Sequence, residues 1–536
     1  MIVGRDGGEV GGADHMGRLD DILAMAGEGL WERVGSGHIT PAAYDTGWVA
    51  RIPDPLGEPE FPEAMDWLVA NQREDGSWGS EVFHEYDRFI NTLSAAVALH
   101  QWGRHPEVVD RAEEYLRSRM GELGDAPEGV ASDHLVGMLV EEARRVGLDI
   151  PHDQSPHQPM GTVRRALLSY VYIDPEHPLG HFVEVLGRGP SQRRVTSQLQ
   201  APDGSIMSSG SSTAASIVFE GEPVRDHTYY DKLRYIRAAS VDGGGVRHFW
   251  DLDVMDRVYC LYNLMHSHSG EREWTEAALA LQDAWMPTGL GFGRHFRVAD
   301  LDDTAMGYRL LTMVGREPDP HVLDAFWRGD HFVTYAVESR GRPGPNVHAL
   351  EAVALSSHPD RDAMVGATVK WLRSRMVDGT HLVDEWHLSP AYCTSHAIPA
   401  FHMIGEALLA ERCASFFLDT QHPDGSWGFV LGNGLGTIEE TAFGLQGLLY
   451  YHHEVERIDT VPIRRAAEYL LEGYPAARHP EMWMAKVLYA PGNIIDTLVL
   501  GALTMYRDWV GGGGRVSPRG GGLRGASVPA VEEEWP

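Results

Sequence analysis

Cysteine is scarce in this chain of 536 residues. The three cysteines, Cys260, Cys393 and Cys413, are too few and too widely spaced for a disulfide framework, and their spacing does not match a zinc site. This usage is typical of a reducing compartment. We therefore expect a cytoplasmic protein of bacterial type whose fold needs no disulfides.

Basic residues are also in short supply. There are 45 Lys and Arg against 77 Asp and Glu, which gives a formal net charge of -32. Such an excess of negative charge repels polyanions, so the composition argues against a nucleic-acid partner. A small anion is still compatible with it, because a few clustered arginines can dominate one pocket.

Long apolar runs are missing. No stretch reaches the ~18 residues that a membrane span needs, and residues 1–16 contain no basic segment followed by an apolar one. We expect no stable membrane insertion. The Gly-rich segment 511–536 has no hydrophobic period, so we expect disordered tails at 1–16 and 511–536.

Strand-like alternation is rare, and helical spacing takes its place. Apolar residues recur at intervals of three and four, for example in 135–143 and 494–503. Gly, Pro and Asp fill the connections, as is usual between packed helices. The sequence therefore predicts an all-α fold.

One repeat joins distant parts of the chain. Segments 72–79 and 421–428 both begin with Gln and end with Asp-Gly-Ser-Trp-Gly, and a weaker copy at 200–206 lacks the Trp. The Gln amide can satisfy backbone groups at a helix end while the Trp ring packs over it. We interpret the copies as structural staples in two related helical domains, with a pocket for a large apolar ligand between the domains.

Three carboxylates crowd the start of one predicted helix. Asp300, Asp302 and Asp303 precede the apolar run 305–311. Mutual repulsion and burial raise the pKa of one carboxyl in such a cluster, so that it keeps its proton. A proton held in this way suits protonation of an alkene, which is a poor base and yields a cation that must be shielded from water. The alternative is an ordinary helix start, where Asp caps free N–H groups.

Further segments occur in a fixed order around these features. They read AAYDTGWVA at 42–50, YDRFINTL at 86–93, DGS and SSTA within 203–214, and DLDDTAM at 300–306. With the Gln/Trp repeat, this set resembles the class II diterpene cyclases of the copalyl diphosphate synthase kind.

The resemblance implies two α/α barrels, called the β and γ domains, with γ inserted into β. On this chain, 17–49 and 275–510 would form the β domain with the acid motif, and 50–274 would form the γ domain. It implies no class I α domain, since we find no Asp-Asp-x-x-Asp motif.

The resemblance also implies an activity, which is the protonation-initiated bicyclisation of geranylgeranyl diphosphate. Asp302 would protonate the terminal double bond, and Asp300 and Asp303 would orient it. The product would be a copalyl-type diphosphate, with ent-copalyl among the candidates, and would pass to a downstream class I terpene synthase. A hydroxylated or rearranged halimadienyl or clerodane-type diphosphate remains an alternative.

By the same resemblance, two histidines are candidates for the terminating base. His181 matches the first position of the base in plant enzymes of the ent series, and His248 stands where those enzymes have Asn. This difference leaves the stereochemical series open. Each residue is alternatively a buried histidine bonded to the backbone.

The anionic head group needs partners of its own. Arg294 matches an Arg of the family, and Arg247 and Arg257 are further candidates for contacts to the diphosphate. Asp125 and Glu128 match an acidic motif of the γ domain and are candidate Mg²⁺ ligands, with a solvated loop as the alternative.

Two other functions are compatible with these patterns. A squalene-hopene type of triterpene cyclase would share the acid motif and the repeat, but its substrate has no diphosphate. A non-enzymatic α/α-barrel binding protein would use the acid motif only as a helix cap.

Overall fold

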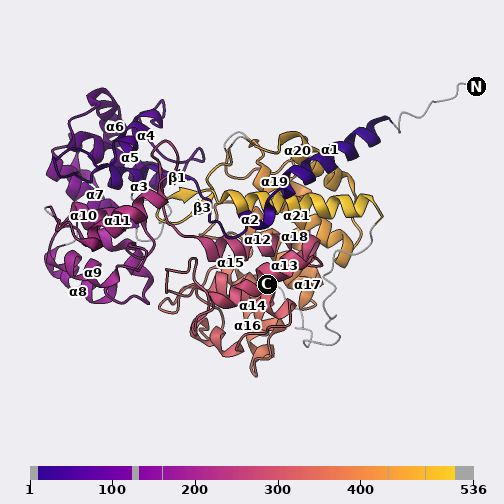
Figure 1. The fold of residues 1–536 in the computed structure, drawn as a ribbon. Coiled ribbons are helices and arrows are strands. Elements are labelled where there is room, and N and C mark those ends of the chain that lie inside the picture. Colours follow the sequence, from indigo (N-terminus) through magenta and orange to yellow (C-terminus); the bar gives the residue numbers. More distant parts are fainter. Residues whose placement is uncertain are drawn as a thin grey trace, which may run out of the picture.

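The computed structural model describes residues 10–123, 132–159, 161–221, 223–431, 434–476 and 478–512. These residues form two helical lobes that lie side by side (Figure 1). The strands among them form two short antiparallel pairs. The prediction of an all-α fold is confirmed.

The first lobe is a ring of helices around its own hydrophobic core. The ring consists of α3 (Ala43–Ala50), α5 (Glu85–Gln101), α7 (Ser132–Val146), the 3-10 helix η3 (Pro178–Leu186) and α10 (Gly210–Val218), and α10 returns to α3. Packed around this ring are α4 (Pro62–Ala70), α6 (Pro106–Arg119), α8 (Thr162–Tyr172), α9 (Pro190–Leu199) and α11 (His227–Ala239). A short 3-10 turn, η2 (His152–Gln154), follows α7.

The second lobe is a closed α/α barrel. Its inner ring runs through α12 (Asp253–His268), α14 (Leu301–Met313), α15 (Pro343–Leu355), α17 (Pro390–Met403), α19 (Ile438–Tyr450) and α21 (Gly492–Val510), which returns to α12. The outer elements are α1 (Val10–Gly27), α2 (Leu30–Arg33), α13 (Arg272–Leu279), α16 (Arg361–Arg375), α18 (Ala407–Thr420) and α20 (Val461–Gly473). Shorter turns are η4 (Ala280–Asp283), η5 (Pro320–Phe326) and the π-helical η7 (Tyr451–Val455).

Local chemistry sets where the inner helices of the second barrel begin. The side chains of Asp300, Ser389 and Thr437 accept backbone N–H bonds at the starts of α14, α17 and α19. Pro343 and Pro390 occupy the first turns of α15 and α17, where no N–H donor is needed. The inner helices therefore begin at defined residues, and they can present the side chains of their first turns at one end of the barrel.

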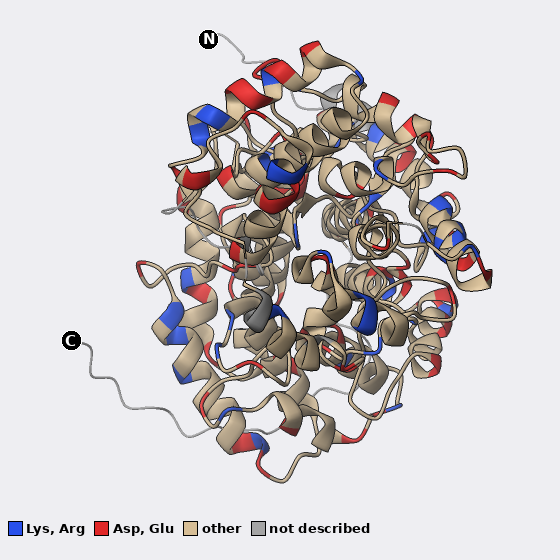
Figure 2. Cartoon of the chain, turned by 90° about the vertical axis from the view of Figure 1, so that its left-hand side faces the viewer, with Lys and Arg blue, Asp and Glu red and all other residues tan. Residues whose placement is uncertain are grey.

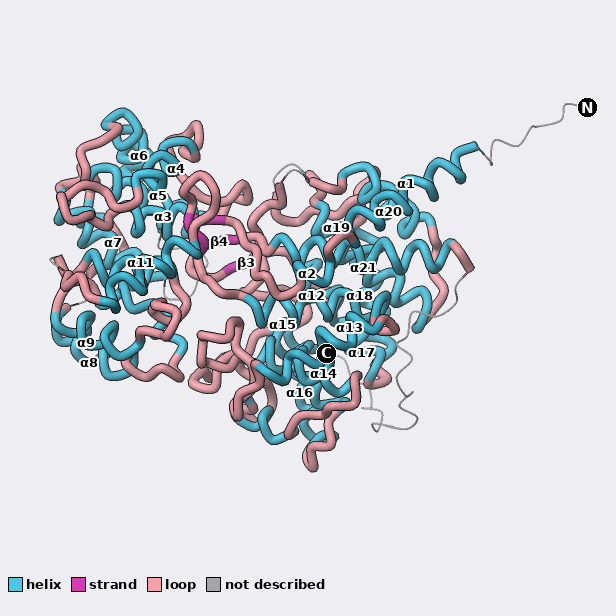
Figure 3. The backbone as a smooth tube through the Cα atoms, in the orientation of Figure 1, coloured by secondary structure: helices cyan, strands magenta, loops and turns pink. Residues whose placement is uncertain are grey.

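The two lobes meet at the strands (Figures 1 and 3). β1 (Pro41–Ala42) pairs with β2 (Val246–Arg247), and β3 (Trp483–Met484) pairs with β4 (Leu488–Tyr489). Between β3 and β4, Val487 packs into the core of the first lobe. The β3–β4 hairpin thus fixes one lobe against the other.

The chain passes between the cores twice. The core of the first lobe takes residues from Ala42 to Val246, whereas Ile39 and Phe249 belong to the second core. Helices α3 and α12 therefore lie in the opposite lobes from those given by the sequence-based division into 17–49 plus 275–510 and 50–274. Helix α1 also begins at Val10, inside the segment for which we expected a disordered tail. Residues 1–9 and 513–536 lie outside the described part of the chain.

The repeated Gln and Trp residues act as the sequence predicts. The amide of Gln421 donates to the carbonyls of Gly425 and Pro462, at 3.0 and 2.8 Å. Gln72 makes the equivalent pair of bonds in the first lobe. The buried indoles of both repeats donate to helix-end carbonyls. Each copy ties one helix end to the next turn.

The excess of acidic residues is spread over the surface and is not gathered in one patch. In Figure 2, Asp and Glu recur around the outline of the molecule and are interspersed with Lys and Arg. Within the described ranges, no helix combines the length and the apolarity that crossing a bilayer requires.

Candidate active site

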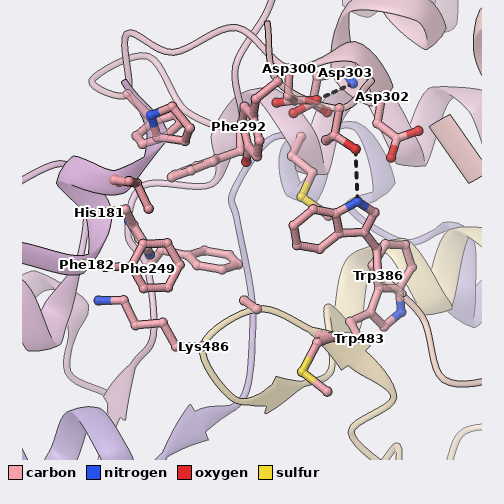
Figure 4. Close-up of a pocket in the computed structure, with 18 of the residues that line it drawn as sticks. His181, Phe182, Phe249, Phe292, Asp300, Asp302, Asp303, Trp386, Trp483 and Lys486 are labelled. Atoms are coloured by element: carbon pink, nitrogen blue, oxygen red, sulfur yellow. Dashed lines mark hydrogen bonds between the residues drawn. The ribbon is translucent and has the colours of Figure 1, made fainter. Parts of the chain in front are cut away.

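A pocket of about 410 Å³ lies between the lobes (Figure 4). This volume is within the usual range for small-molecule sites. The first lobe contributes the start of η3, and the second contributes the starts of its inner helices and the β3–β4 hairpin. The walls are largely aromatic: Phe249, Tyr259, Phe292, Phe296, Trp386 and Trp483.

The three aspartates stand at one end of this pocket (Figure 4). Asp300 caps α14, since its Oδ1 accepts the N–H of Asp303 at 2.9 Å. The helix-cap interpretation is therefore correct for Asp300. It does not account for Asp302 and Asp303, whose side chains are also buried.

The cluster is built to retain a proton. Burial raises the pKa of Asp300 to about 7, and the neighbouring Asp302 carboxylate adds to the rise. Burial and the charge of Asp300 raise the pKa of Asp303 well above its ordinary value. The Oδ1 of Asp303 has no hydrogen-bond partner among the described residues. At neutral pH the cluster therefore holds at least one proton in a water-poor site.

A histidine that does not line the pocket contacts Asp302. Its Oδ1 lies 2.6 Å from Nδ1 of His348, and Nε2 of His348 lies 2.9 Å from Nδ1 of His396. Sequence reasoning did not find these two histidines. They follow Asp302 at separations of 46 and then 48 residues, and no local pattern marks them.

Of the two histidines predicted from the sequence, His181 stands across the pocket from the aspartates (Figure 4), and His248 contacts it. Nδ1 of His181 faces the carbonyl of Met207 at 2.9 Å, and Nδ1 of His248 faces Oδ2 of Asp45 at 3.0 Å. Their Nε2 atoms lie 3.4 Å apart. His181 lines the pocket, and His248 lies behind it. Burial, and then the charge of Lys486, lower the pKa of both histidines well below the ordinary value.

Lys486 is a pocket residue that the sequence did not reveal. Its Nζ lies 2.6 Å from Oε1 of Glu184 and 2.8 Å from the hydroxyl of Ser209. Tyr44 donates to the same carboxylate at 2.9 Å. Lys486 and Glu184 are 302 residues apart and come together only because the hairpin bridges the lobes.

The three candidate arginines are not brought to the pocket wall. Arg294 is exposed and pairs with Asp253. Arg247 is buried and lies over the ring of Trp250, with 4.6 Å from its guanidinium carbon to the ring centroid. Arg257 is partly buried on α12.

The candidate Mg²⁺ ligands Asp125 and Glu128 lie outside the described residues. Apart from the three aspartates, the described residues of the pocket wall include one carboxylate, Glu338, which pairs with Arg342. The Mg²⁺ site stays a prediction, and we derive no chemical step through it.

A separate cluster of His321, Asp324 and His358 has the spacing of a metal site. Nδ1 of His358 accepts the N–H of Asp360 at 3.0 Å, and its Nε2 faces Asp324 at 3.0 Å. Nε2 must then carry the proton, so this ring cannot ligate a metal through it. The cluster is a hydrogen-bonded triad.

Comparisons with known proteins agree with this architecture. No family model matches the chain. The chain is 29% identical over 402 residues to copalyl diphosphate synthase 1 of Isodon rubescens, covering 72% of the chain and 49% of that protein. It is 29% identical over 495 residues to a type B diterpene cyclase of Mycobacterium tuberculosis, covering 88% and 96%. The chain thus spans about half the length of the plant relative.

Among solved structures, ent-copalyl diphosphate synthase from Streptomyces platensis matches with a TM-score of 0.71 at 22% identity, covering 92% of this chain and 99% of that one. The paired helical lobes are the fold of that synthase. The chain is similar to class II diterpene cyclases in sequence and to a solved copalyl diphosphate synthase in fold, and the family resemblance of the sequence is confirmed.

Proposed function

We propose that this enzyme protonates geranylgeranyl diphosphate, closes two rings and releases a bicyclic, copalyl-type diphosphate. The observation that carries the proposal is the buried carboxylate cluster at one end of an aromatic pocket. The names of the relatives support the substrate class, since they include copalyl diphosphate synthases.

The reaction begins at Asp302. Its carboxyl transfers a proton to the terminal double bond, and the electron pair of that bond forms the new C–H bond. Asp300 and Asp303 keep the cluster protonated in its buried site. The aromatic walls stabilise the resulting carbocation through their π faces and exclude water from it.

The reaction ends at the histidine pair. With Nδ1 of His181 donating to Met207 and Nδ1 of His248 donating to Asp45, both Nε2 atoms carry lone pairs. The Nε2 of His248 also accepts the backbone N–H of Lys486 at 3.4 Å, so His181, which lines the pocket and whose Nε2 lies 3.4 Å from that of His248, is the ring that meets the cation. Since burial and Lys486 keep both rings neutral at rest, the pair is ready to accept a proton from the bicyclic cation.

The diphosphate takes no part in these steps and leaves with the product. A class I terpene synthase, which ionises diphosphates, is therefore the kind of enzyme that would act next. His248 stands where plant enzymes of the ent series have Asn, so the enantiomeric series of the product has to be measured.

The test is a product assay. Purified protein is incubated with geranylgeranyl diphosphate, with and without Mg²⁺, and the mixture is dephosphorylated and separated by chiral gas chromatography with mass spectrometry. Copalol supports the proposal and identifies the series. A hydroxylated or rearranged alcohol keeps the class and changes the final quench. Unchanged geranylgeraniol from folded protein contradicts the proposed substrate, and squalene is then the next one to test.

A further inference from the structure

The weaker copy of the Gln/Trp repeat forms the same Asp-Gly turn as the two strong copies. The N–H of Gly204 donates to the carbonyl of Ala201 at 2.9 Å, as in the other turns. The hydroxyl of Ser205 donates to Asp203 at 2.8 Å, and the serines of the strong copies make the same bond. The copy departs from the others at Ile206, where the Trp and the Gly that follows it are replaced.

A tight turn of another kind follows this copy. The N–H of Ser209 donates to the carbonyl of Ile206 at 3.1 Å. Both central residues have a left-handed backbone, with φ of 51° at Met207 and 52° at Ser208. This is the pattern of a type I′ turn, whose central positions normally hold Asn, Asp or Gly. Met and Ser are strained there, and strain that persists in a packed structure points to a functional constraint.

The central peptide of this turn is held in one orientation from both sides. On one side, the carbonyl of Met207 faces Nδ1 of His181 at 2.9 Å. On the other, the N–H of Ser208 donates to Oγ of Ser205 at 3.2 Å. The single hydroxyl hydrogen of Ser205 already goes to Asp203, so its oxygen can only accept here. The N–H therefore stays on the side of the serine, and the carbonyl stays on the side of the histidine.

The orientation of this peptide selects the tautomer of His181. A carbonyl only accepts, so Nδ1 carries the proton and Nε2 keeps a lone pair. His248 favours the opposite tautomer, because its Nε2 lies 3.4 Å from Nε2 of His181 and could accept a proton from it. The rings packed around His181 carry neither a donor nor a lone pair: Phe182, Phe249, Phe292 and Phe296. Among the described residues, the Met207 carbonyl thus decides which nitrogen is free.

We propose that the Met207–Ser208 peptide is a positioning element, which keeps Nε2 of His181 free of a proton so that the reaction ends by proton loss. The inference rests on the proposed function. In the final step, a carbon beside the cationic centre gives its proton to Nε2, and the electron pair of that C–H bond becomes the new double bond. A reversed peptide would present the N–H of Ser208 to Nδ1 and place the ring proton on Nε2. The cation would then be quenched by water or lose a different proton.

Glycine at position 207 tests this inference. A Gly-Ser pair is typical of type II′ turns, in which the central peptide is reversed relative to type I′. We expect Met207→Gly to raise the fraction of hydroxylated or rearranged product by about tenfold, because the reversed peptide stabilises the other tautomer. Substrate should be consumed at nearly the wild-type rate, since Asp302 is untouched. Product fractions equal to those of wild-type protein would overturn the proposal.

Met207→Ala is the matched control. It also removes the buried Met207 side chain, but its Cβ disfavours the type II′ conformation at this position. Ser208→Gly is a second control, because glycine at the second central position favours type I′. Both variants should keep the wild-type product fractions. If Met207→Ala shifts the product as far as Met207→Gly does, lost packing is the cause and the proposal is wrong.

Nitrogen NMR of protein with labelled histidine gives a readout that a merely structural role would not move. The signals of His181, identified by their loss in His181→Gln, should change to the Nε2–H tautomer in Met207→Gly and remain in the Nδ1–H tautomer in Met207→Ala. The Nδ1–H tautomer in both variants would overturn the proposal. If Met207→Gly does not fold by circular dichroism, Ser205→Ala replaces it, with the same expected and contradicting results, because it removes the acceptor of the Ser208 N–H.

Failure of the positioning role is distinguishable from failure of the function. If wild-type protein forms no bicyclic product, the proposed function is wrong. If wild-type protein cyclises and Met207→Gly keeps its product fractions, only the role of the turn is wrong. A wild-type product that is itself hydroxylated would also contradict that role, because the cation then loses no proton to His181.

Discussion

The Nε2 atoms of His181 and His248 lie 3.4 Å apart, although the residues are 67 positions apart in the chain. Each ring is oriented by a bond from its other nitrogen, to Met207 and to Asp45. The Nε2 of His248 also accepts the backbone N–H of Lys486, at 3.4 Å. His181 and the aspartate cluster stand at opposite ends of the same pocket (Figure 4).

We expect His248→Phe to change the product more than the consumption of substrate. Without the second lone pair, the bicyclic cation is quenched by water or loses a different proton. The fraction of hydroxylated or rearranged alcohol should rise in gas chromatography, whereas His321→Ala, on the exposed surface, should not alter it. An unchanged product profile in His248→Phe would show that the pair is not the base.

Asp302→Asn should abolish turnover and leave the fold intact. An amide cannot supply the proton, and loss of a general acid typically costs ~100- to 10,000-fold in rate. The measurement is product formed per hour beside a circular dichroism melt. Asp362→Asn, an exposed substitution on α16, serves as the control. Retention of activity in Asp302→Asn contradicts the assigned acid.

Asp300 should make the protein less stable as pH rises. Its folded pKa of about 7 is above the ordinary value, so the folded state binds more protons between about pH 4 and 7. This contribution is present below pH 4 and is lost as pH rises through 7. It amounts to at most about 4 kcal/mol.

Asp300→Asn keeps a good helix cap and removes the titration. Denaturant unfolding at a series of pH values should therefore give a smaller decline for the variant between pH 4 and 7 than for the wild-type protein. Parallel curves for the two proteins would contradict the raised pKa.

The Gln/Trp repeat should affect stability without affecting chemistry. Gln421→Ala leaves the backbone carbonyls of Gly425 and Pro462 without this donor, which should cost about 1–3 kcal/mol in the free energy of unfolding. Turnover per folded molecule should be unchanged. Gln72→Ala is the equivalent change in the first lobe. Loss of turnover at unchanged stability would contradict the structural role.

Local patterns predicted the parts of the molecule that are encoded locally. Helical spacing, the repeat and the adjacent aspartates are readable from short segments. Arg294 was predicted from its neighbourhood alone, and the structure turns it outward to Asp253, because the loop before α14 packs against the start of α12.

Partners from distant segments could not be predicted. His348 meets Asp302, and His396 meets His348, only because α14, α15 and α17 are consecutive members of one ring. Lys486 reaches Glu184 because the β3–β4 hairpin enters the first lobe. The passage between lobes near Ile39 and Phe249 depends on the same long-range packing, so no change of composition marks it.

Reaction of geranylgeranyl diphosphate in D₂O, followed by mass spectrometry of the intact product, tests whether a carboxyl of the protein starts the cyclisation. Initiation by a solvent-exchanged carboxyl predicts a bicyclic diphosphate with one carbon-bound deuterium and no released pyrophosphate. A product without deuterium, or stoichiometric release of pyrophosphate, would contradict cyclisation by protonation.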